Sequence, residues 1–518
     1  MACLCSASGY PSACNPPTAA TNDTPVVGTV QRDSITITIL SYVGIVIGYV
    51  NKILLLPNFF SETQVGLVNI LVSFSVIYAQ FSALGINFTI VKFFPFFRTE
   101  DRTHNGLFFW SGVGVSFGFI LFTLLFLLFR NPVMEYYSQE SPLLSQYYLL
   151  LIPMGFTTLF YNFFTSWLQA FHKNVISSFS NEIVLRLLVT IEISLYVFKV
   201  LTFEQFVIGY VLIYFVPTVI LLIYTLRLHY TRYKPCFSRR VKKLASIASV
   251  YGFWQYLGGT SNYIVPTVDQ AMLAGMWGLA ENGIYGIMLC LVSVMQMPYR
   301  SLVKVSTPVV TELWKARDFQ GMRHISREVS LMNLIAGCYL FVIIWVNLDN
   351  IFSLMPEQYS AGRYVFLFLG LGRIIDMYSG LNSAILMTSK KYRYEFLMSL
   401  FLVGLTIGTN LLLIPRFGMN GAALATMISI IIFNIGHVTF VWRFYRIQPF
   451  ALKDSVVALI GLLSIGVSAL IPTMGHFILD AVIRTLIITA VFGIPIYLSG
   501  ISPTLNTTIE RFYHRVFR

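Results

Sequence analysis

The sequence predicts an all-α polytopic membrane protein with about 14 transmembrane helices. Its 518 residues are 56% hydrophobic and only 11% charged, whereas soluble globular proteins carry about 25% charged residues. Apolar stretches of roughly 20 residues, the length that crosses a bilayer, recur along the chain. Most of these stretches must be helices, because a lone strand exposed to lipid cannot satisfy its backbone hydrogen bonds.

A basic segment divides the apolar stretches into two groups. Residues 227–243 carry seven Lys or Arg residues and no Asp or Glu. We predict six spans before this segment and eight after it. The first six are 34–56, 64–90, 105–129, 144–170, 175–199 and 204–226, and the others are 245–271, 282–308, 327–348, 363–388, 394–414, 419–442, 454–472 and 476–500.

The distribution of positive charge predicts the orientation in the membrane. With the N-terminus inside, 25 of the 35 Lys and Arg residues fall in cytoplasmic loops and tails, the side on which cationic residues are enriched. The sequence therefore predicts a multi-pass protein of the cell inner (plasma) membrane with both termini in the cytoplasm. The same bias accounts for the net charge of +13 without a nucleic-acid partner, since no soluble domain remains to bind one.

The spans and the basic segment together predict the domain organisation. Residues 1–33, rich in Ser, Pro, Ala and Thr, are expected to form a disordered cytoplasmic tail. The remaining parts are an N-terminal lobe of spans 1–6 (34–226), a basic cytoplasmic linker (227–244), a C-terminal lobe of spans 7–12 (245–443), spans 13 and 14 (454–500) and a C-terminal cytoplasmic tail (501–518).

Short motifs recur in the same order in the two halves. Gln64-Val-Gly66 opens the second span and Glu281-Asn-Gly283 opens the eighth. These spans close with Val91-Lys92 before Pro95, and with Val303-Lys304 before Pro308. The shared order predicts two six-helix lobes in a parallel pseudo-repeat around a central cavity, a common plan among transporters, plus two C-terminal helices.

The opening of each half resembles a known family. Several short stretches of the sequence resemble polysaccharide exporters. In the second half they are Val268-Asp269-Gln270 to Gly275, Gly283-Ile-Tyr285 and Pro308, and in the first half they are Gln31 to Ser34 and Gly48 to Lys52. These belong to the multidrug/oligosaccharidyl-lipid/polysaccharide exporter superfamily, in which the O-antigen (Wzx-type) flippases are the most similar branch. The resemblance covers nearly the whole chain from Gln31 onward. It implies two six-helix lobes around a central cavity, and flipping of an undecaprenyl-diphosphate-linked oligosaccharide to the outer leaflet for O-antigen and lipopolysaccharide biosynthesis.

Two cations near the middle of predicted spans are candidates to bind the diphosphate. A charge at this depth costs at least ~2.5–3.5 kcal/mol, so it usually faces a cavity or a partner. Arg373 is followed three residues later by Asp376, and Arg186 follows Glu182 by four residues. Both spacings place the two charges on one helical face, so each cation either lines the cavity or only neutralises its acidic neighbour.

Two further cations, Arg300 and Lys304, share one face of the eighth span near its cytoplasmic end. This position suits capture of a diphosphate headgroup from the inner leaflet, because Arg presents a planar fork to phosphate and Lys a point charge. The alternative is that both side chains snorkel to the membrane interface.

Acidic and amide side chains supply the other candidates. Asp376, Asp269 and Glu182 are candidates to couple transport to H⁺ or Na⁺. Asp269 is expected to end the seventh span near the outer face, where the alternative is an ordinary interfacial residue at a helix end. Asn51 and Gln80 either contact sugar hydroxyls or form hydrogen bonds between helices. In contrast, Asp480 and Arg484 in the last span are expected to be a structural pair.

The sequence argues against catalysis. It contains no phosphate-binding Gly-Lys-Ser/Thr loop, no metal-ligand cluster, no sign of a cofactor and no loop long enough for an enzyme active site. Two alternatives stay open: a drug or organic-cation antiporter of the same superfamily, which acidic cavity residues would favour, and a membrane-embedded glycosyltransferase or polymerase. The expected partners are the lipid-linked oligosaccharide, membrane lipids and other polysaccharide-assembly proteins.

Overall fold

The computed structural model describes residues 24–99, 103–228, 235, 239–472, 477–503, 506–507 and 510. Over these residues the protein consists of helices and their connections, without strands. Residues 1–23 of the predicted N-terminal tail lie outside the described residues, as do parts of the basic linker and of the C-terminal tail. The first helix begins at Thr24, ahead of the predicted start at residue 34.

In the described residues before the basic linker there are twelve α-helices. They are α1 Thr24–Tyr49, α2 Leu56–Phe59, α3 Glu62–Ala83, α4 Ile86–Phe97, α5 Leu107–Leu128, α6 Arg130–Ser138, α7 Pro142–Tyr147, α8 Leu151–Ala170, α9 Val175–Phe179, α10 Arg186–Val197, α11 Phe203–Ile213 and α12 Phe215–Arg227. The same half contains two π-helical turns, η1 Val50–Leu55 and η4 Ser180–Leu185, and two 3₁₀ turns, η2 His104–Gly106 and η3 Tyr148–Leu150.

From Arg239 onward, the described residues form nine α-helices. They are α13 Arg239–Met276, α14 Leu279–Ala316, α15 Phe319–Val346, α16 Leu348–Phe352, α17 Arg363–Tyr378, α18 Asn382–Thr388, α19 Tyr392–Tyr445, α20 Ser455–Ser468 and α21 Phe477–Leu498, with 3₁₀ turns η5 Glu357–Gly362 and η6 Leu452–Asp454.

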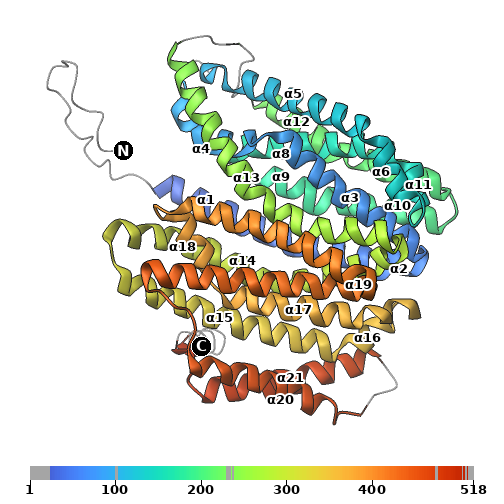
Figure 1. The fold of residues 1–518 in the computed structure, drawn as a ribbon, viewed down its shortest axis with the longest axis vertical. Coiled ribbons are helices and arrows are strands. Elements are labelled where there is room, and N and C mark those ends of the chain that lie inside the picture. Colours follow the sequence, from blue (N-terminus) through green and yellow to red (C-terminus); the bar gives the residue numbers. More distant parts are fainter. Residues whose placement is uncertain are drawn as a thin grey trace.

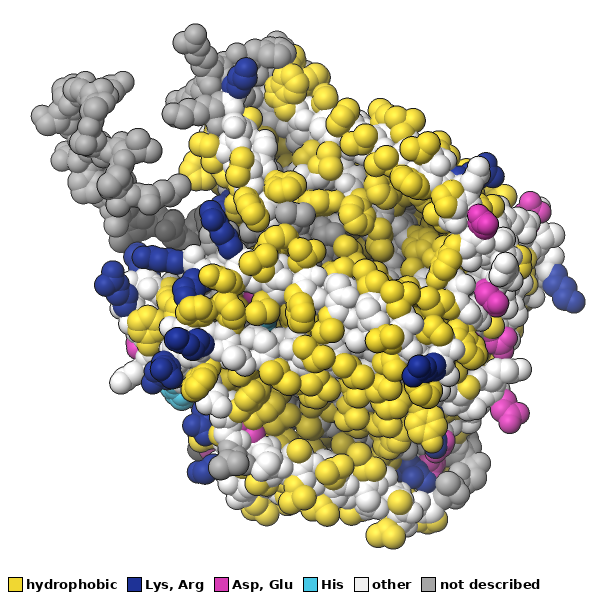
Figure 2. Space-filling view, viewed as in Figure 1, with side chains coloured by type: hydrophobic (Ala, Val, Ile, Leu, Met, Phe, Trp, Pro, Cys, Tyr) yellow, Lys and Arg dark blue, Asp and Glu magenta, His cyan; other side chains and the backbone are white. Residues whose placement is uncertain are grey.

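The protein is a multi-pass membrane protein. In the part of the chain that the structure describes, nine helices are long and apolar enough to cross a bilayer, or ten if the bent pair formed by η5–α17 and α18 counts as one span. Figure 2 shows a broad hydrophobic band across the molecule, with most Lys and Arg side chains at one edge and Asp and Glu side chains mainly at the opposite edge. Each of the 14 predicted spans coincides with helical segments. That all 14 spans cross the membrane remains a prediction.

Three predicted spans differ in shape from the expectation of simple helices. The span predicted at 64–90 is broken, because Leu84 (φ 48°) and Gly85 (φ 75°) adopt left-handed backbone conformations that a right-handed helix cannot contain. The spans predicted at 394–414 and 419–442 form the single element α19, which turns sharply at Gly418 (φ 55°, ψ −133°). We call residues 392–417 its first arm and residues 419–445 its second arm.

The arrangement of the helices brings the two halves of the chain into contact. Figure 1 shows α3–α12 in the upper part of the molecule and α14–α21 in the lower part. Two elements join these parts: α13 packs against both α3 and α19, and α14 packs against α3. At the lower edge, α20 and α21 pack against α15 and each other.

The closest approach between α3 and α14 occurs at Gly66 and Gly283, the glycines that open the corresponding spans of the predicted repeat. A Cβ atom on Gly66 would lie 1.8 Å from the carbonyl oxygen of Leu279, and one on Gly283 would lie 2.3 Å from that of Glu62. Each oxygen belongs to the residue four positions before the opposite glycine, so the contact is nearly symmetric. Asn282 Nδ2 also donates a hydrogen bond to Gly66 O at 3.2 Å. We call this contact the glycine crossing.

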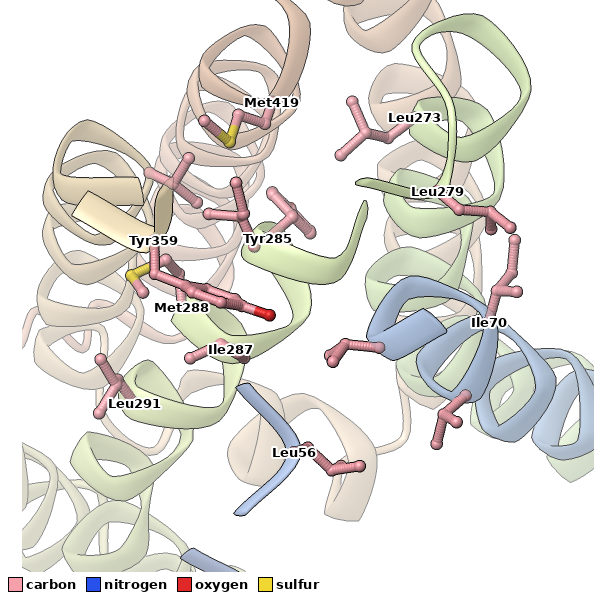
Figure 3. Close-up of a cluster of buried hydrophobic side chains, with 14 of the residues drawn as sticks. Leu56, Ile70, Leu273, Leu279, Tyr285, Ile287, Met288, Leu291, Tyr359 and Met419 are labelled. Atoms are coloured by element: carbon pink, nitrogen blue, oxygen red, sulfur yellow. The ribbon is translucent and has the colours of Figure 1, made fainter. Parts of the chain in front are cut away.

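A buried apolar cluster surrounds the glycine crossing (Figure 3). Ile70 of α3 and Leu279 of α14 lie next to each other, while Leu56 comes from α2 and Tyr359 from η5. All four side chains are at most 3% exposed. The cluster therefore excludes water from this junction between the two halves.

Replacing Gly283 with Ala should destabilise the protein by about 1–3 kcal/mol, the usual penalty for overpacking, because the new methyl group would collide with the backbone of α3. Gly404→Ala is the matched control, since no atom lies within 4 Å of the position its Cβ would take. Thermal unfolding of the two purified variants in detergent provides the comparison. Equal melting temperatures would show that the two helices separate easily at the glycine crossing.

Candidate functional site

Asp269 is fully buried in α13 and accepts hydrogen bonds from three other helical segments. Tyr285 Oη of α14 donates to Oδ2 at 2.9 Å, and Asn410 Nδ2 of the first arm donates to Oδ1 at 2.7 Å. The hydroxyl of Thr426, in the second arm, also donates to Oδ2. Asp269 lies within its helix rather than at the helix end that the sequence suggested, because α13 continues past Pro266 to Met276. The predicted end of the seventh span at residue 271 and the position of Asp269 near the outer face stay predictions.

The surroundings of Asp269 are rich in oxygen atoms. Asn410 Oδ1 is buried and, within the described part of the chain, has no hydrogen-bond partner. Together with the Asp269 carboxylate and the Thr426 hydroxyl it forms a set of oxygen donors of the kind that hard cations prefer. No cluster of three or more His, Cys, Asp or Glu side chains able to hold a metal ion occurs among the described residues.

Arg373 and Asp376 form a loose ion pair on α17. Arg373 Nη1 lies 3.4 Å from Asp376 Oδ2, and the two side chains are 20% and 23% exposed. This distance exceeds the 2.7–2.9 Å of a strong charge-assisted hydrogen bond. Asn434 Nδ2 of the second arm donates to Asp376 Oδ1 at 3.3 Å. The charge of Arg373 also acts on Asp269, so the two predicted ion-coupling carboxylates of the second half, Asp376 and Asp269, share one electrostatic environment.

A second titratable pair in this half, Glu395 and His437, was missed by the sequence analysis. His437 Nε2 lies 3.2 Å from Glu395 Oε2, and the side chains are 3% and 16% exposed. Ser383 Oγ of α18 donates to the other carboxylate oxygen at 2.6 Å. The signal was present in the sequence, because an ionisable residue inside an apolar span suggests function by itself.

In the first half, Arg186 and Glu182 form a tight pair. Arg186 Nη2 lies 2.5 Å from Glu182 Oε2, and Nη1 donates to the carbonyl oxygen of Gly44 in α1. Gly44 and Gly48 make room for this pair, since a Cβ atom on either would lie within 2.7 Å of Glu182 or Arg186. Arg186 is therefore largely committed to contacts within the protein.

Asn51 lies beside this pair and joins helices. Asn51 Nδ2 donates to Arg186 O at 2.9 Å, and Thr190 Oγ1 donates to Asn51 Oδ1 at 2.8 Å. Asn51 lies in the π-helical turn η1 and Glu182 in the π-helical turn η4, and π-helical turns frequently occur at functional sites. The contacts of Asn51 match the hydrogen-bonding alternative, while Gln80 is partly buried on α3.

Arg300 and Lys304 are exposed on α14. Arg300 Nη2 donates to Gln296 Oε1 at 3.1 Å, on the same helix. Within the described part of the chain, neither cation has a carboxylate within ion-pair distance. Both are therefore available to an external anion, unlike Arg186.

An apolar groove of about 590 Å³ is lined by Met297, Pro298 and Ser301 of α14. Arg300 lies on the same turn of α14 but is not one of the lining residues. The opposite walls come from α15 and α21, with Tyr42 of α1. The same stretch of α14 thus carries an exposed cation and one wall of an apolar groove.

The contacts of Arg484 agree with a structural role. Arg484 Nε donates to Asp480 Oδ2 at 2.6 Å, and its other nitrogens reach the carbonyl oxygens of Ser468 and Ile471 at 3.4 and 3.1 Å. Asn350 Nδ2 donates to the same Asp480 oxygen at 2.7 Å. The pair therefore caps the C-terminal end of α20.

Comparison with known proteins places these features in context. Residues 30–314 match the family described as "Polysaccharide biosynthesis protein". An uncharacterized membrane protein of Methanocaldococcus jannaschii is 24% identical over 479 residues, which cover 88% of this chain and 91% of the relative. The capsular polysaccharide biosynthesis protein CapF of Staphylococcus aureus is 22% identical over 223 residues, which cover 43% of this chain and 54% of the relative.

Two solved structures share the fold. The lipid II flippase MurJ, in an inward closed conformation, superposes with a TM-score of 0.67 at 15% identity, covering 88% of this chain and 98% of its own. An inward-facing multidrug resistance transporter of the MATE family, in the MOP superfamily, superposes with a TM-score of 0.61 at 13% identity, covering 79% of this chain and 94% of its own.

The Asp269 network predicts a specific stability effect. Asp269→Asn should lower the free energy of unfolding by about 1–3 kcal/mol, because the new amide group leaves buried hydrogen-bonding groups without a proper partner. Asp349→Asn is the control, since Asp349 is 81% exposed in its pair with Arg363 and such pairs contribute at most about 1 kcal/mol. Chemical denaturation in detergent measures both variants, and an unchanged Asp269→Asn protein would contradict the network.

Proposed function

Since the chain belongs to the polysaccharide biosynthesis protein family, we propose that it moves a polyprenyl-diphosphate-linked oligosaccharide from the inner to the outer leaflet of the plasma membrane. The observation that supports this proposal is that one stretch of α14 carries the exposed cations Arg300 and Lys304 and also lines an apolar groove through Met297, Pro298 and Ser301. An anionic headgroup joined to a long hydrocarbon needs these two surfaces side by side. The sequence resemblance to O-antigen flippases supports a cell-surface polysaccharide repeat as the sugar.

The headgroup would first meet Arg300 and Lys304 and then Arg373. Among the residues that the structure describes, Arg300 and Lys304 have no carboxylate to release before they bind phosphate. Arg373 keeps most of its five N–H donors available, because its contact with Asp376 is a single long one. Arg186 has a supporting role in this scheme, since Glu182 and Gly44 already hold its guanidinium.

The hydrocarbon chain would occupy the groove between α14, α15 and α21. The lining is mainly apolar and includes Met332, Ile335 and Phe492. The bilayer is as apolar as this lining, so the groove would hold the hydrocarbon by van der Waals packing rather than by the hydrophobic effect. The groove also gives α21 a role in holding the lipid.

Alternating access would be driven by an ion, H⁺ or Na⁺, that binds at Asp269. Asp269 contacts α14 and both arms of α19, so a change in its charge is felt by three packed segments at once. The glycine crossing would separate during the outward-open phase. The predicted cytoplasmic position of both termini supports uptake of the substrate at the Arg300 end of α14.

Arg373→Ala should abolish flipping, and Arg300→Ala should weaken it by at least about tenfold, because a hydrogen bond to a charged group contributes about 1.5–3 kcal/mol. The measurement is the accessibility of the lipid-linked sugar to a membrane-impermeant probe in cells that depend on this chain. Arg416→Ala, an exposed cation at the other end of the spans, is the control. Normal flipping by Arg373→Ala would make Arg373 structural, and ethidium efflux by the wild type would instead favour the antiporter.

Filling the groove should slow flipping without unfolding the protein. Gly493 lines the groove, and no atom lies within 4 Å of its missing Cβ, so Gly493→Phe places a ring where the hydrocarbon would lie. Gly466→Phe on α20 is the matched control, because that position is equally open and is not part of the groove. The same accessibility assay should separate them, and equal flipping rates would remove the groove from the substrate path.

A further inference from the structure

We propose that Glu395 and His437 form a proton-binding site that ties together the ends of the two arms of α19. The site lies at the end of the second half that is predicted to be cytoplasmic. Proton binding itself does not depend on transport. Its role in the transport cycle rests on the function proposed above.

The contact of the pair is short enough for a hydrogen bond. His437 Nε2 and Glu395 Oε2 are 3.2 Å apart and are both buried, and neither atom has another hydrogen-bond partner among the described residues. A neutral His437 that carries its ring proton on Nε2 donates to the Glu395 carboxylate and leaves the pair with one net negative charge. One further proton, which makes the ring an imidazolium, keeps the shared hydrogen bond and makes the pair electrically neutral as a whole.

Other nearby charges do not replace this proton. Arg373 on α17 is paired with Asp376. Lys391 is turned onto the ring of Phe444 at 2.9 Å, and Arg393 lies 6.0 Å from the ring centre of Trp254 on α13.

Two side chains complete the surroundings of Glu395. Tyr299 of α14 interacts electrostatically with Glu395, Asp376 and Arg373, and Ser383 of α18 donates to the second oxygen of Glu395. Loss of the shared proton would leave one uncompensated negative charge, which is costly at a buried position. The pair therefore binds or releases a proton together with a structural change.

The location gives this change a mechanical consequence. Glu395 begins the first arm and His437 lies near the end of the second arm, so the pair connects the two arms opposite their turn at Gly418. Ser383 adds α18, the short helix beyond the 50° bend after α17. Protonation would hold these three helix ends together. Release of the proton to water would let these helix ends separate. The only covalent change is the loss of one N–H or O–H bond in the pair and the gain of one O–H bond in water.

Infrared difference spectroscopy of the full-length protein in lipid vesicles tests the site. The sample is titrated from about pH 8 to pH 5, the range in which His changes charge. The wild type should show protonation of a histidine and a changed carboxyl band. The part of both signals that belongs to the pair should be missing in Glu395→Gln and in His437→Gln, while the contributions of the other histidines remain. The control is His324→Gln, which removes the histidine of an exposed His–Glu pair, His324 and Glu328, whose Nε2 and Oε1 atoms are 4.0 Å apart. Spectra of both site variants that match the wild type would overturn the proposal.

Two further measurements keep the outcome decisive. If either variant fails to fold, ¹⁵N-histidine NMR of the wild type replaces it. One of the seven histidines must then change its protonation state with pH while its ring N–H protons exchange slowly with solvent. The absence of such a histidine would refute the site. Flipping is measured in parallel in vesicles with and without a pH gradient. Proton uptake without any flipping would refute the transport proposal alone, whereas normal, pH-independent flipping by His437→Gln would remove the pair from the cycle.

Discussion

The close contact of backbone with backbone at Gly66 and Gly283 is the constraint on which the rest of the structure depends. Each glycine leaves no room for a side chain, so α3 and α14 approach more closely than ordinary helices do. Packed cores change between discrete arrangements rather than deforming continuously. A junction held by two glycines and an apolar cluster, with few polar contacts, is able to close tightly and to separate without leaving charged groups unpaired.

The two halves that meet at this junction differ in how they hold their charges. In the first half, Glu182 and Arg186 satisfy each other and the backbone of α1, and removing either would strand a partly buried charge. In the second half, Arg373 is loosely paired, Asp269 is held only by neutral donors, and Glu395 faces His437. Groups whose charge can change during a cycle therefore lie in α13, α17 and α19, and the first half adds the buried carboxyl of Glu192 in α10, which is 4% exposed. The glycine crossing lies between these two halves.

Much of the fold followed from the sequence because apolar length and turn residues are local properties. The helical segments were predicted, and the repeat identified Gly66 and Gly283 as equivalent before their contact was known. The depth of Asp269 was not predictable, since Pro266 suggested a helix end although neighbouring helices support a continuous α13. Glu395 and His437 were missed because their pairing depends on a turn at Gly418, a long-range feature that periodicity does not report. Arg300 and Lys304 were found, yet only the structure revealed that no described carboxylate accompanies them.

The charges of the second half suggest why a diphosphate carrier would need titratable groups at all. A diphosphate that takes over the Arg373 guanidinium leaves Asp376 without its cation, and an unpaired buried carboxylate is unstable by several kcal/mol. Asn434 alone cannot neutralise that charge. A proton or cation arriving in the same cluster restores neutrality, and Tyr299 lies close enough to both Asp376 and Glu395 for their charges to act on its phenol. Substrate binding and ion binding would then favour each other through a shared charge balance, without direct contact between the two ligands. Because such coupling is reciprocal, release of the lipid-linked sugar at the outer leaflet would in turn lower the affinity of the protein for the ion.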